Sequence, residues 1–487
     1  MNWNFDNTYF RQLEGFYAAQ APERPPRAEL VMFNRDLAAQ LGLDLSPGRD
    51  QELAQQLSGA MVPAGADPIA LAYAGHQFGH FSPQLGDGRA VLLGEIVAPN
   101  GMRHDLQLKG SGRTPFSRNG DGKLVLGPAL REYLVSEAMA ALGIPTTRTL
   151  SVVTTGESIT RGGPHPGAVL ARIAASHIRV GTFQFFAAHL GADHVRKLAD
   201  YAIARHYPQA ASAANPYLAL LEEVMNAQIA LVAKWISVGF VHGVMNTDNV
   251  SISGETIDYG PCAFIDSYAP HAVFSSIDEG GRYAFGNQPN ICRWNMLQLA
   301  SALAEIIAEK GEEEIERVNA LLGDFASRYL DAWIAAMRQK LGLFTEEAAD
   351  FELANALFAA MEGQDVDYTL FFRRLADVPS SGDSGVAGLF NDGQAIGPWL
   401  ARWKDRVARD ETSAEQRREA MNAVNPLYIP RNHKVEEALE AAENGDMAPF
   451  VKLLDVVTHP YAERDGLDDY AMPAPDDFGR YVTFCGT

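Results

Sequence analysis

The strongest chemical signal in this chain is a pair of hard oxygen donors, Asn249 and Asp258, carried by two neighbouring segments. The first reads HGVMNTDNVSI (242–252) and the second TIDYGP (256–261). We expect a hydrophobic strand, a polar turn and a short strand to form a hairpin that presents both side chains together. Amide and carboxylate oxygens at this density suit Mg²⁺ bound with nucleotide phosphates. An ordinary turn would explain Asn249 or Asp258 alone, because Asn and Asp are common in turns. It would not explain the whole ordered set of motifs that these two residues complete.

Three further signals come earlier in the chain. The sequence GDGR (86–89), at the expected tip of a hairpin, would bring backbone N–H groups and the charge of Arg89 to phosphate oxygens, although by itself such a motif is more often a simple turn. Lys109 ends an expected strand, where a solvated lysine is the ordinary alternative. Glu132 follows on an expected helix and would hold the lysine ammonium by a charge-assisted bond. Glu137 on the same helix competes for this role.

The order of these signals is that of the protein kinases: glycine-rich loop, strand lysine, helix glutamate, catalytic loop and Asp-x-Gly. The order departs from a kinase at one decisive position. A kinase has its catalytic Asp five residues before the metal-binding Asn, and Val244 stands there in this chain. Valine cannot accept a proton, and the glycine-rich loop also lacks the usual G-x-G-x-x-G spacing. A conventional kinase is therefore missing its general base.

The charge distribution points to a localised anion site. The chain has 40 Lys+Arg against 61 Asp+Glu, a net charge of −21, which disfavours binding to nucleic acid or to an anionic membrane. Residues 81–180 hold 11 Lys/Arg against 7 Asp/Glu, or +4, so the remaining 387 residues carry −25. A chance cluster of solvated side chains is the alternative explanation.

Composition and cysteine content indicate a cytoplasmic globular protein. The 487 residues are 47% hydrophobic, enough for a large core, and three cysteines are too few for a disulfide scaffold. The first ten residues, MNWNFDNTYF, do not resemble a secretory signal. The most apolar long stretch (227–244) is interrupted by Lys234 and His242, so we interpret it as a buried helix and loop, with no membrane span.

Hydrophobic periodicity and turn signals predict strands first and helices later. Strands are expected over residues 90–97, 104–109, 149–153 and 167–173, with a glycine-rich loop over 109–122. Helices are expected over residues 127–143, 216–239, 292–310, 313–341, 345–361 and 435–457. The tail, 463–487, is rich in Asp, Pro and Gly and is expected to be irregular.

Together with NPLYIPRNH (425–433) and Cys485, these motifs closely resemble the selenoprotein O (YdiU) family over essentially the whole chain. The stretches LKGSGRTPFSR (108–118), HGVMNTDN (242–249) and DYGP (258–261) are the most specific. The resemblance implies an α+β, protein-kinase-like bilobal fold with a small strand-rich N-lobe and a larger helical C-lobe. The expected boundaries are an N-terminal extension at 1–65, the N-lobe at 66–180, the C-lobe at 181–420, and a C-terminal helical extension and tail at 421–487.

The family resemblance also implies an activity. Its members transfer AMP from ATP to Ser, Thr or Tyr hydroxyls of proteins, with Mg²⁺ and release of pyrophosphate, and they bind ATP flipped relative to kinases. Uridylylation with Mn²⁺ and UTP is also attributed to bacterial members. Two further alternatives stay open at this point: a phosphoryl-transferring kinase, and an inert nucleotide-binding pseudokinase scaffold.

Matching motif by motif, the resemblance gives each candidate residue a role. Lys109, oriented by Glu132, would bind phosphates, Asp248 would accept the proton of the hydroxyl or orient it, and Asn249 and Asp258 would hold the metal. The residues that would contact the nucleotide are Gly86, Gly88, Arg89, Lys109, Asp121, Gly122, Arg172, Arg179 and Asp258.

The two arginines agree with this chemistry on physical grounds. Attack on the α-phosphorus releases pyrophosphate, whose charge must be neutralised, and Arg172 and Arg179 can supply bidentate contacts. Arg172 lies within an apolar strand pattern, where an arginine needs an anionic partner. A purely structural ion pair is the alternative.

The resemblance also bears on the cysteines. In some relatives the terminal cysteine, matched here by Cys485, pairs with a cysteine beyond the Asp-Tyr-Gly. The position that matches this second cysteine is Phe274, and Cys262 lies only four residues after Asp258. We therefore expect free, reduced thiols.

Overall fold

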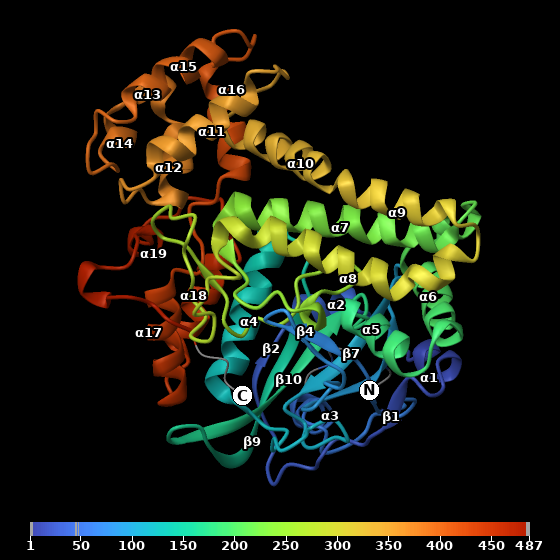
Figure 1. The fold of residues 1–487 in the computed structure, drawn as a ribbon. Helices are drawn as coiled ribbons and strands as arrows, with labels where there is room; N and C mark the ends of the chain where they lie inside the picture. Colours follow the sequence, from blue (N-terminus) through green and yellow to red (C-terminus); the bar gives the residue numbers. More distant parts are fainter. Residues whose placement is uncertain (1–2, 44–45, 47, 484–487) are drawn as a thin grey trace.

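The computed structural model describes residues 3–43, 46 and 48–483, which form a mixed α+β structure. An antiparallel sheet occupies the first part of the chain, and a helical region follows it (Figure 1). None of the helices in the described part of the chain is long and apolar enough to cross a membrane.

The main sheet has the strand order β1-β3-β6-β7-β10-β9-β2, with β8 beside β10. The strands are β1 (Tyr17–Ala19), β2 (Glu29–Phe33), β3 (Ile69–Leu71), β6 (Ala90–Val97), β7 (Arg103–Lys109), β8 (Leu124–Val125), β9 (Arg148–Thr160) and β10 (Pro164–Ala174). Two small sheets pair β4 (Gly75–Gln77) with β5 (His80–Ser82), and β11 (Phe240–Val241) with β12 (Ala263–Phe264). Both edge strands of the main sheet thus come from the segment interpreted as an N-terminal extension, because β1 and β2 lie within residues 17–33.

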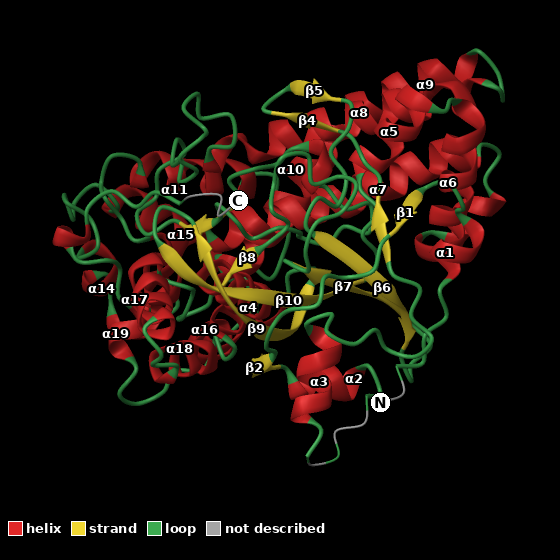
Figure 2. Ribbon diagram, turned by 90° about the horizontal axis from the view of Figure 1, so that it is seen from below, coloured by secondary structure: helices red, strands yellow, loops and turns green. Residues whose placement is uncertain are grey.

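Alternating apolar residues bury the two faces of the sheet against different helices. Val153 and Val169 pack with α2 (Arg35–Gln40) and α3 (Asp50–Leu57), which Figure 2 shows together on one side of the strands. Their neighbours Val152 and Leu170 pack with α4 (Leu126–Ala141) on the opposite face. Because side chains alternate between the two faces of a strand, Val152 and Leu170 face α4. This packing fixes the position of α4, which carries Glu132, on the sheet.

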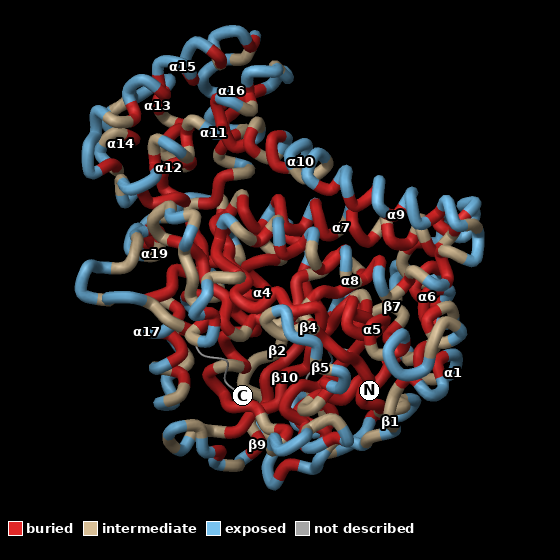
Figure 3. The backbone as a smooth tube through the Cα atoms, viewed as in Figure 1, coloured by how far each residue is buried: buried red, intermediate tan, exposed pale blue. Residues whose placement is uncertain are grey.

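The helical region continues from the sheet through α5 (Val180–His189) and α6 (Ala192–His206). Buried residues occur along the whole length of α7, whereas much of the segment from α13 to α16 is exposed (Figure 3). The longer helices are α7 (Pro216–Val238), α8 (Gln288–Ala308), α9 (Glu313–Gly323), α10 (Phe325–Lys340), α11 (Asp350–Met361), α15 (Gly397–Val407), α16 (Ala414–Val424), α17 (Asn432–Glu443) and α18 (Ala448–Val457). The shorter ones are α1 (Thr8–Gln12), α12 (Tyr368–Leu375), α13 (Val378–Ser381), α14 (Ser384–Ala387) and α19 (Asp468–Ala471).

The structure corrects several of the expected elements. Strand β6 has the predicted bounds, but β9 and β10 are longer than expected, and the helix expected over 345–361 begins only at Asp350. The helix expected over 313–341 is divided at Asp324 into α9 and α10. The helix expected over 435–457 is divided because Gly445 adopts a left-handed φ of +93°, after which Pro449 starts α18 in the first turn.

Candidate functional site

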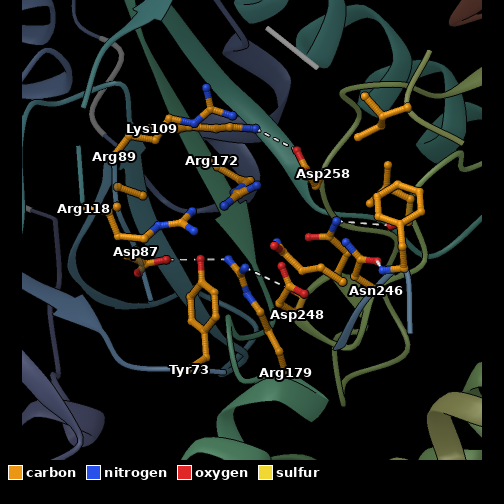
Figure 4. A pocket seen from close by; sticks show the side chains of 17 residues that line it. Tyr73, Asp87, Arg89, Lys109, Arg118, Arg172, Arg179, Asn246, Asp248 and Asp258 are labelled. Atoms are coloured by element: carbon orange, nitrogen blue, oxygen red, sulfur yellow. Dashed lines mark hydrogen bonds and ion pairs between the residues drawn. The ribbon is translucent and has the colours of Figure 1, made fainter. Parts of the chain in front are cut away.

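A cavity of about 360 Å³ lies where the sheet meets the helical region (Figure 4). Its wall brings together residues from the strands, the 86–89 loop and the segments around Asn249 and Asp258. The lining residues are Tyr73, Gln77, Phe78, Asp87, Gly88, Arg89, Ala90, Lys109, Arg118, Arg172, Arg179, Val244, Asn246, Asp248, Asn249, Asp258 and Ile277.

Two adjacent strands deliver the first pair of cations. Lys109 ends β7, and on the neighbouring β10 Arg172 pairs in register with Gln107. Glu132 of α4 reaches both cations: its Oε2 lies 2.5 Å from Lys109 Nζ, and its Oε1 lies 3.2 Å from Arg172 Nη1. Burial alone would raise the pKa of Glu132, but the two cations outweigh burial and lower it. Glu132 therefore holds Lys109, whereas Glu137 faces elsewhere and pairs with Arg148.

Asp258 closes this network from the helical side. Its Oδ1 lies 3.0 Å from Lys109 Nζ, and its φ of +70° is a left-handed conformation that is uncommon outside glycine. Burial acts to raise the pKa of Asp258, but Lys109, Arg89 and Arg172 bring it well below its usual value. The carboxylate is therefore ionised and available to a cation.

Arg179, just before α5, forms a second cationic centre. Its guanidinium carbon lies 4.3 Å from the centre of the Tyr73 ring, and its Nη1 donates to the main-chain oxygen of Asp248 (2.9 Å). Nη2 is 3.7 Å from Asp87 Oδ1. Asp87 also accepts a hydrogen bond from Gln107 Nε2 (3.0 Å), which links this centre to β7. Arg179 is only 6% exposed, so its charge acts inside the cavity.

The short 3₁₀ helix Thr247–Asn249 carries the remaining polar groups. Asn249 Nδ2 donates to the main-chain oxygen of Val244 (3.2 Å), which leaves its amide oxygen available to a ligand. Among the described residues, none donates a hydrogen bond to the buried Oδ1 of Asp248. Burial raises the pKa of Asp248 to about 6, with a smaller contribution from Asp258, against the opposing effect of Arg179. This carboxylate can therefore exchange a proton near neutral pH.

The donor set fits a hard divalent cation. Asn249 and Asp258 offer an amide oxygen and an ionised carboxylate in the wall of one cavity. Two protein oxygens leave the other coordination positions of Mg²⁺ for phosphate oxygens and water, as is usual for this ion in nucleotide sites.

Comparison with known proteins agrees with this arrangement. The family described as "Protein adenylyltransferase SelO" matches residues 1–458. The chain belongs to the SelO family. It is 56% identical to "Protein nucleotidyltransferase YdiU" of Sphingopyxis alaskensis, over the full length of both chains. Proteins of the same name from Cereibacter sphaeroides and a Bradyrhizobium species are 56% and 54% identical, again over 100% of both chains. As a SelO member, the chain is a nucleotidyltransferase.

Not every residue matched to the SelO motifs lines the cavity. Gly88 and Arg89 do, but in a loop between β5 and β6, and not at a hairpin tip. Gly86 is not among the residues that line the cavity. Its φ is +75°, and a Cβ added there would come within 2.3 Å of Phe116. Asp121 and Gly122 are not among the lining residues, and Asp121 pairs with Arg161 at 2.7 Å. Their contact with nucleotide stays a prediction.

The expected hairpin between Asn249 and Asp258 is wrong in its details. Val250 and Ile252 belong to no strand, and β11 pairs instead with β12, which begins beyond Asp258. The two donors still line one cavity. The pairing of β11 with β12 brings the chain after Asp258 back beside the end of α7, where the segment that carries Asn249 begins.

Several lining residues of this SelO member were absent from the sequence-based site. Asp87 lies within the GDGR motif, whose glycines marked the position, but Tyr73 and Gln77 have no local signature. Arg118 lies within the LKGSGRTPFSR stretch without having been assigned a role.

The cysteine prediction is tested only in part. Cys262 and Cys292 are buried and form no disulfide within the described residues, and burial raises the pKa of the Cys262 thiol to about 11. Cys485 lies outside the described residues. Thr483, two residues before Cys485, lies beside Phe274, the position matched to the relatives' second cysteine: Thr483 N donates to Phe274 O (2.7 Å).

Proposed function

We propose that this protein transfers AMP from ATP to Ser, Thr or Tyr hydroxyls of proteins, in a kinase-like two-lobed fold with Mg²⁺ as the cofactor. The observation that carries the proposal is the pair of nearly buried arginines in the cavity wall. Arg172 is 3% exposed and Arg179 6%, and both lie in the same cavity as Lys109. Such cations suit the polyphosphate end of a nucleotide. We therefore place the triphosphate tail innermost and the nucleoside towards the opening, the reverse of a kinase.

In this orientation the α-phosphorus faces the acceptor. The acceptor oxygen attacks it, the bond to the bridging oxygen between the α- and β-phosphates breaks, and pyrophosphate leaves with that electron pair. The hydroxyl proton passes to Asp248, whose buried Oδ1 receives no hydrogen bond within the described part of the structure. Asn249 and Asp258 would hold Mg²⁺, which supplies charge neutralisation to the phosphates when bound. Lys109, kept in place by Glu132, contacts the phosphates in the same cavity.

A conventional kinase is disfavoured by one position in the wall. Val244 lines the cavity at the sequence position where a kinase has its catalytic carboxylate. Its side chain is an alkyl group, and its main-chain oxygen already accepts a hydrogen bond from Asn249 Nδ2. Asp248, four residues later, is the carboxylate available for proton transfer.

The test uses two isotopic labels. Incubation with protein acceptors, Mg²⁺ and ATP labelled at the α-phosphorus should label protein and release unlabelled pyrophosphate, whereas ATP labelled at the γ-phosphorus should not label protein. Labelling from the γ-position with ADP as product would establish a kinase instead. Stronger labelling from α-labelled UTP with Mn²⁺ would establish a uridylyltransferase. Thermal stabilisation by ATP and Mg²⁺ without any label transfer would leave an inert scaffold.

A further inference from the structure

The loop between β7 and β8 is fastened to the rim of the cavity. At its base Gly112 N donates to Gly122 O (3.1 Å). In its middle Ser117 Oγ donates to Gly88 O (2.5 Å), and Gly88 lines the cavity. The residue that follows this second attachment is therefore held next to the cavity.

That residue, Arg118, adopts a backbone conformation that arginine rarely takes. Its φ is +53°, in the left-handed region where a side chain crowds its own backbone. Its side chain lines the cavity and points towards the centre, between Arg89 and Asp87 (Figure 4). Strain of this kind in a cavity wall is typical of functional positions.

Arg118 also differs from its neighbours in its charge partners. Lys109, Arg172 and Arg179 each lie within 4 Å of a carboxylate of the protein. Arg118 is exposed, and its side chain has no hydrogen bond or ion pair with any residue in the described part of the chain. Its charge is therefore available to an anion that enters the cavity.

The position of Arg118 indicates which part of the ligand it meets. In Figure 4 Arg118 enters from the wall opposite Asp248 and Asp258, beside Asp87, whose carboxylate pairs with Arg179. In-line displacement at phosphorus places the leaving group opposite the attacking oxygen. If the acceptor oxygen lies at Asp248, the leaving group lies on the side of Arg118.

We infer that Arg118 is a binding residue for the leaving pyrophosphate, contacting the β- and γ-phosphates of the bound nucleoside triphosphate from the loop. The inference rests on the proposed function for the orientation of the nucleotide. A guanidinium can make two parallel hydrogen bonds to phosphate oxygens, and the left-handed backbone holds it over the cavity before the ligand arrives. In this arrangement Arg172 and Arg179 contact the polyphosphate from the cavity wall, and Arg118 reaches it from the loop, beside Asp87.

The test compares Arg118→Ala with Arg113→Ala. Arg113 is an exposed arginine of the same loop that does not line the cavity, so the two variants lose the same charge. Calorimetry with Mg²⁺ measures binding of inorganic pyrophosphate, ATP and AMP without any acceptor. We expect Arg118→Ala to weaken binding of pyrophosphate and ATP about 10-fold or more and to leave AMP within about twofold, in line with loss of a charge-assisted contact. Arg113→Ala should change none of the three beyond about twofold.

A third variant separates binding from folding. Arg118→Gly removes the guanidinium and also relieves the left-handed backbone, so it should lose pyrophosphate binding as Arg118→Ala does while its Tm rises by about 1–2 °C over that of Arg118→Ala. A merely structural arginine would lower the Tm in both variants and leave pyrophosphate affinity unchanged.

Equal affinities of the Arg118 and Arg113 variants would overturn the inference, and so would a loss of AMP affinity as large as that of ATP. Because these affinities are measured without transfer, they are independent of the labelling experiment. If the label shows γ-transfer, the proposed function fails whatever the affinities are.

Discussion

Replacing Glu132 by glutamine should separate the catalytic ion network from ordinary structural ion pairs. Glu132 is 3% exposed and its carboxylate serves two buried cations, Lys109 at 2.5 Å and Arg172 at 3.2 Å. A neutral amide accepts from only one of them and presents its own N–H groups to the other. Removing one partner from a buried ion pair costs about 3–5 kcal/mol. We expect Glu132→Gln to lose about 3 kcal/mol of unfolding free energy.

The effect on transfer should be larger than a general loss of stability explains. Without the carboxylate, Lys109 keeps its ion pair with Asp258 at 3.0 Å, and its position over the phosphates is no longer fixed from two sides. We expect kcat/KM for nucleotidyl transfer to fall about 100-fold, equivalent to about 2.7 kcal/mol of transition-state stabilisation. Steady-state labelling at a temperature where the variant is fully folded, checked by circular dichroism, measures this loss.

The matched control is Glu137→Gln on the same helix. Glu137 is 6% exposed, and it accepts two hydrogen bonds from Arg148 (2.7 and 2.5 Å) and one from Asn34 (2.8 Å), outside the cavity. It should lose stability similarly and keep transfer within about threefold. The reasoning is refuted if Glu137→Gln loses transfer as much as Glu132→Gln, or if Glu132→Gln transfers nucleotide at the wild-type rate.

Three further outcomes are expected. Asp258→Ala should lose Mg²⁺-dependent ATP binding and transfer together in calorimetry and labelling, because it removes the ionised oxygen donor; wild-type transfer by this variant would show the metal assignment to be wrong. Gly86→Ala should weaken ATP binding by displacing Phe116, whereas Gly101→Ala, at a similar φ of +81° with no atom within 4 Å, should cost only stability, as parallel calorimetry and thermal melts would show. Burial alone would raise the pKa of Asp410, but hydrogen bonds and two neighbouring arginines lower it from 3.8 to about 2. The ionised carboxylate therefore stabilises the fold fully above pH 3.8, and this stabilisation is lost as the pH falls through 2. Asp410→Asn should therefore cost about 2 kcal/mol at pH 7 in urea unfolding, with a deficit that shrinks between pH 4 and pH 2; a constant deficit would contradict this origin.

Local patterns were sufficient for the elements that carry the site. The run of apolar residues between Gly88 and the turn at 98–102 predicted β6 residue for residue, and a proline near the start with a glycine at the end bracketed α4. These signals act over one or two turns of chain, so they are legible in sequence. The helix divisions at Asp324 and Gly445 were missed because the apolar periodicity continues across both breaks.

The site shows the same division. The types and order of Lys109, Glu132, Asn249 and Asp258 indicated a nucleotide and a metal, because charge and hard oxygen donors are properties of the residues themselves. The order left open whether Glu132 or Glu137 meets the lysine, and only the packing of α4 on the sheet face decided it.

What the sequence determined by itself was therefore the chemistry: cations for a polyphosphate, oxygens for a hard cation, and no carboxylate at Val244. Only the tertiary structure decided which groups share the cavity, including Tyr73 and the guanidinium of Arg118. Chain pairing across long separations brings such groups together, and a residue's neighbours along the chain carry no record of the partner that strand register and helix packing place beside it.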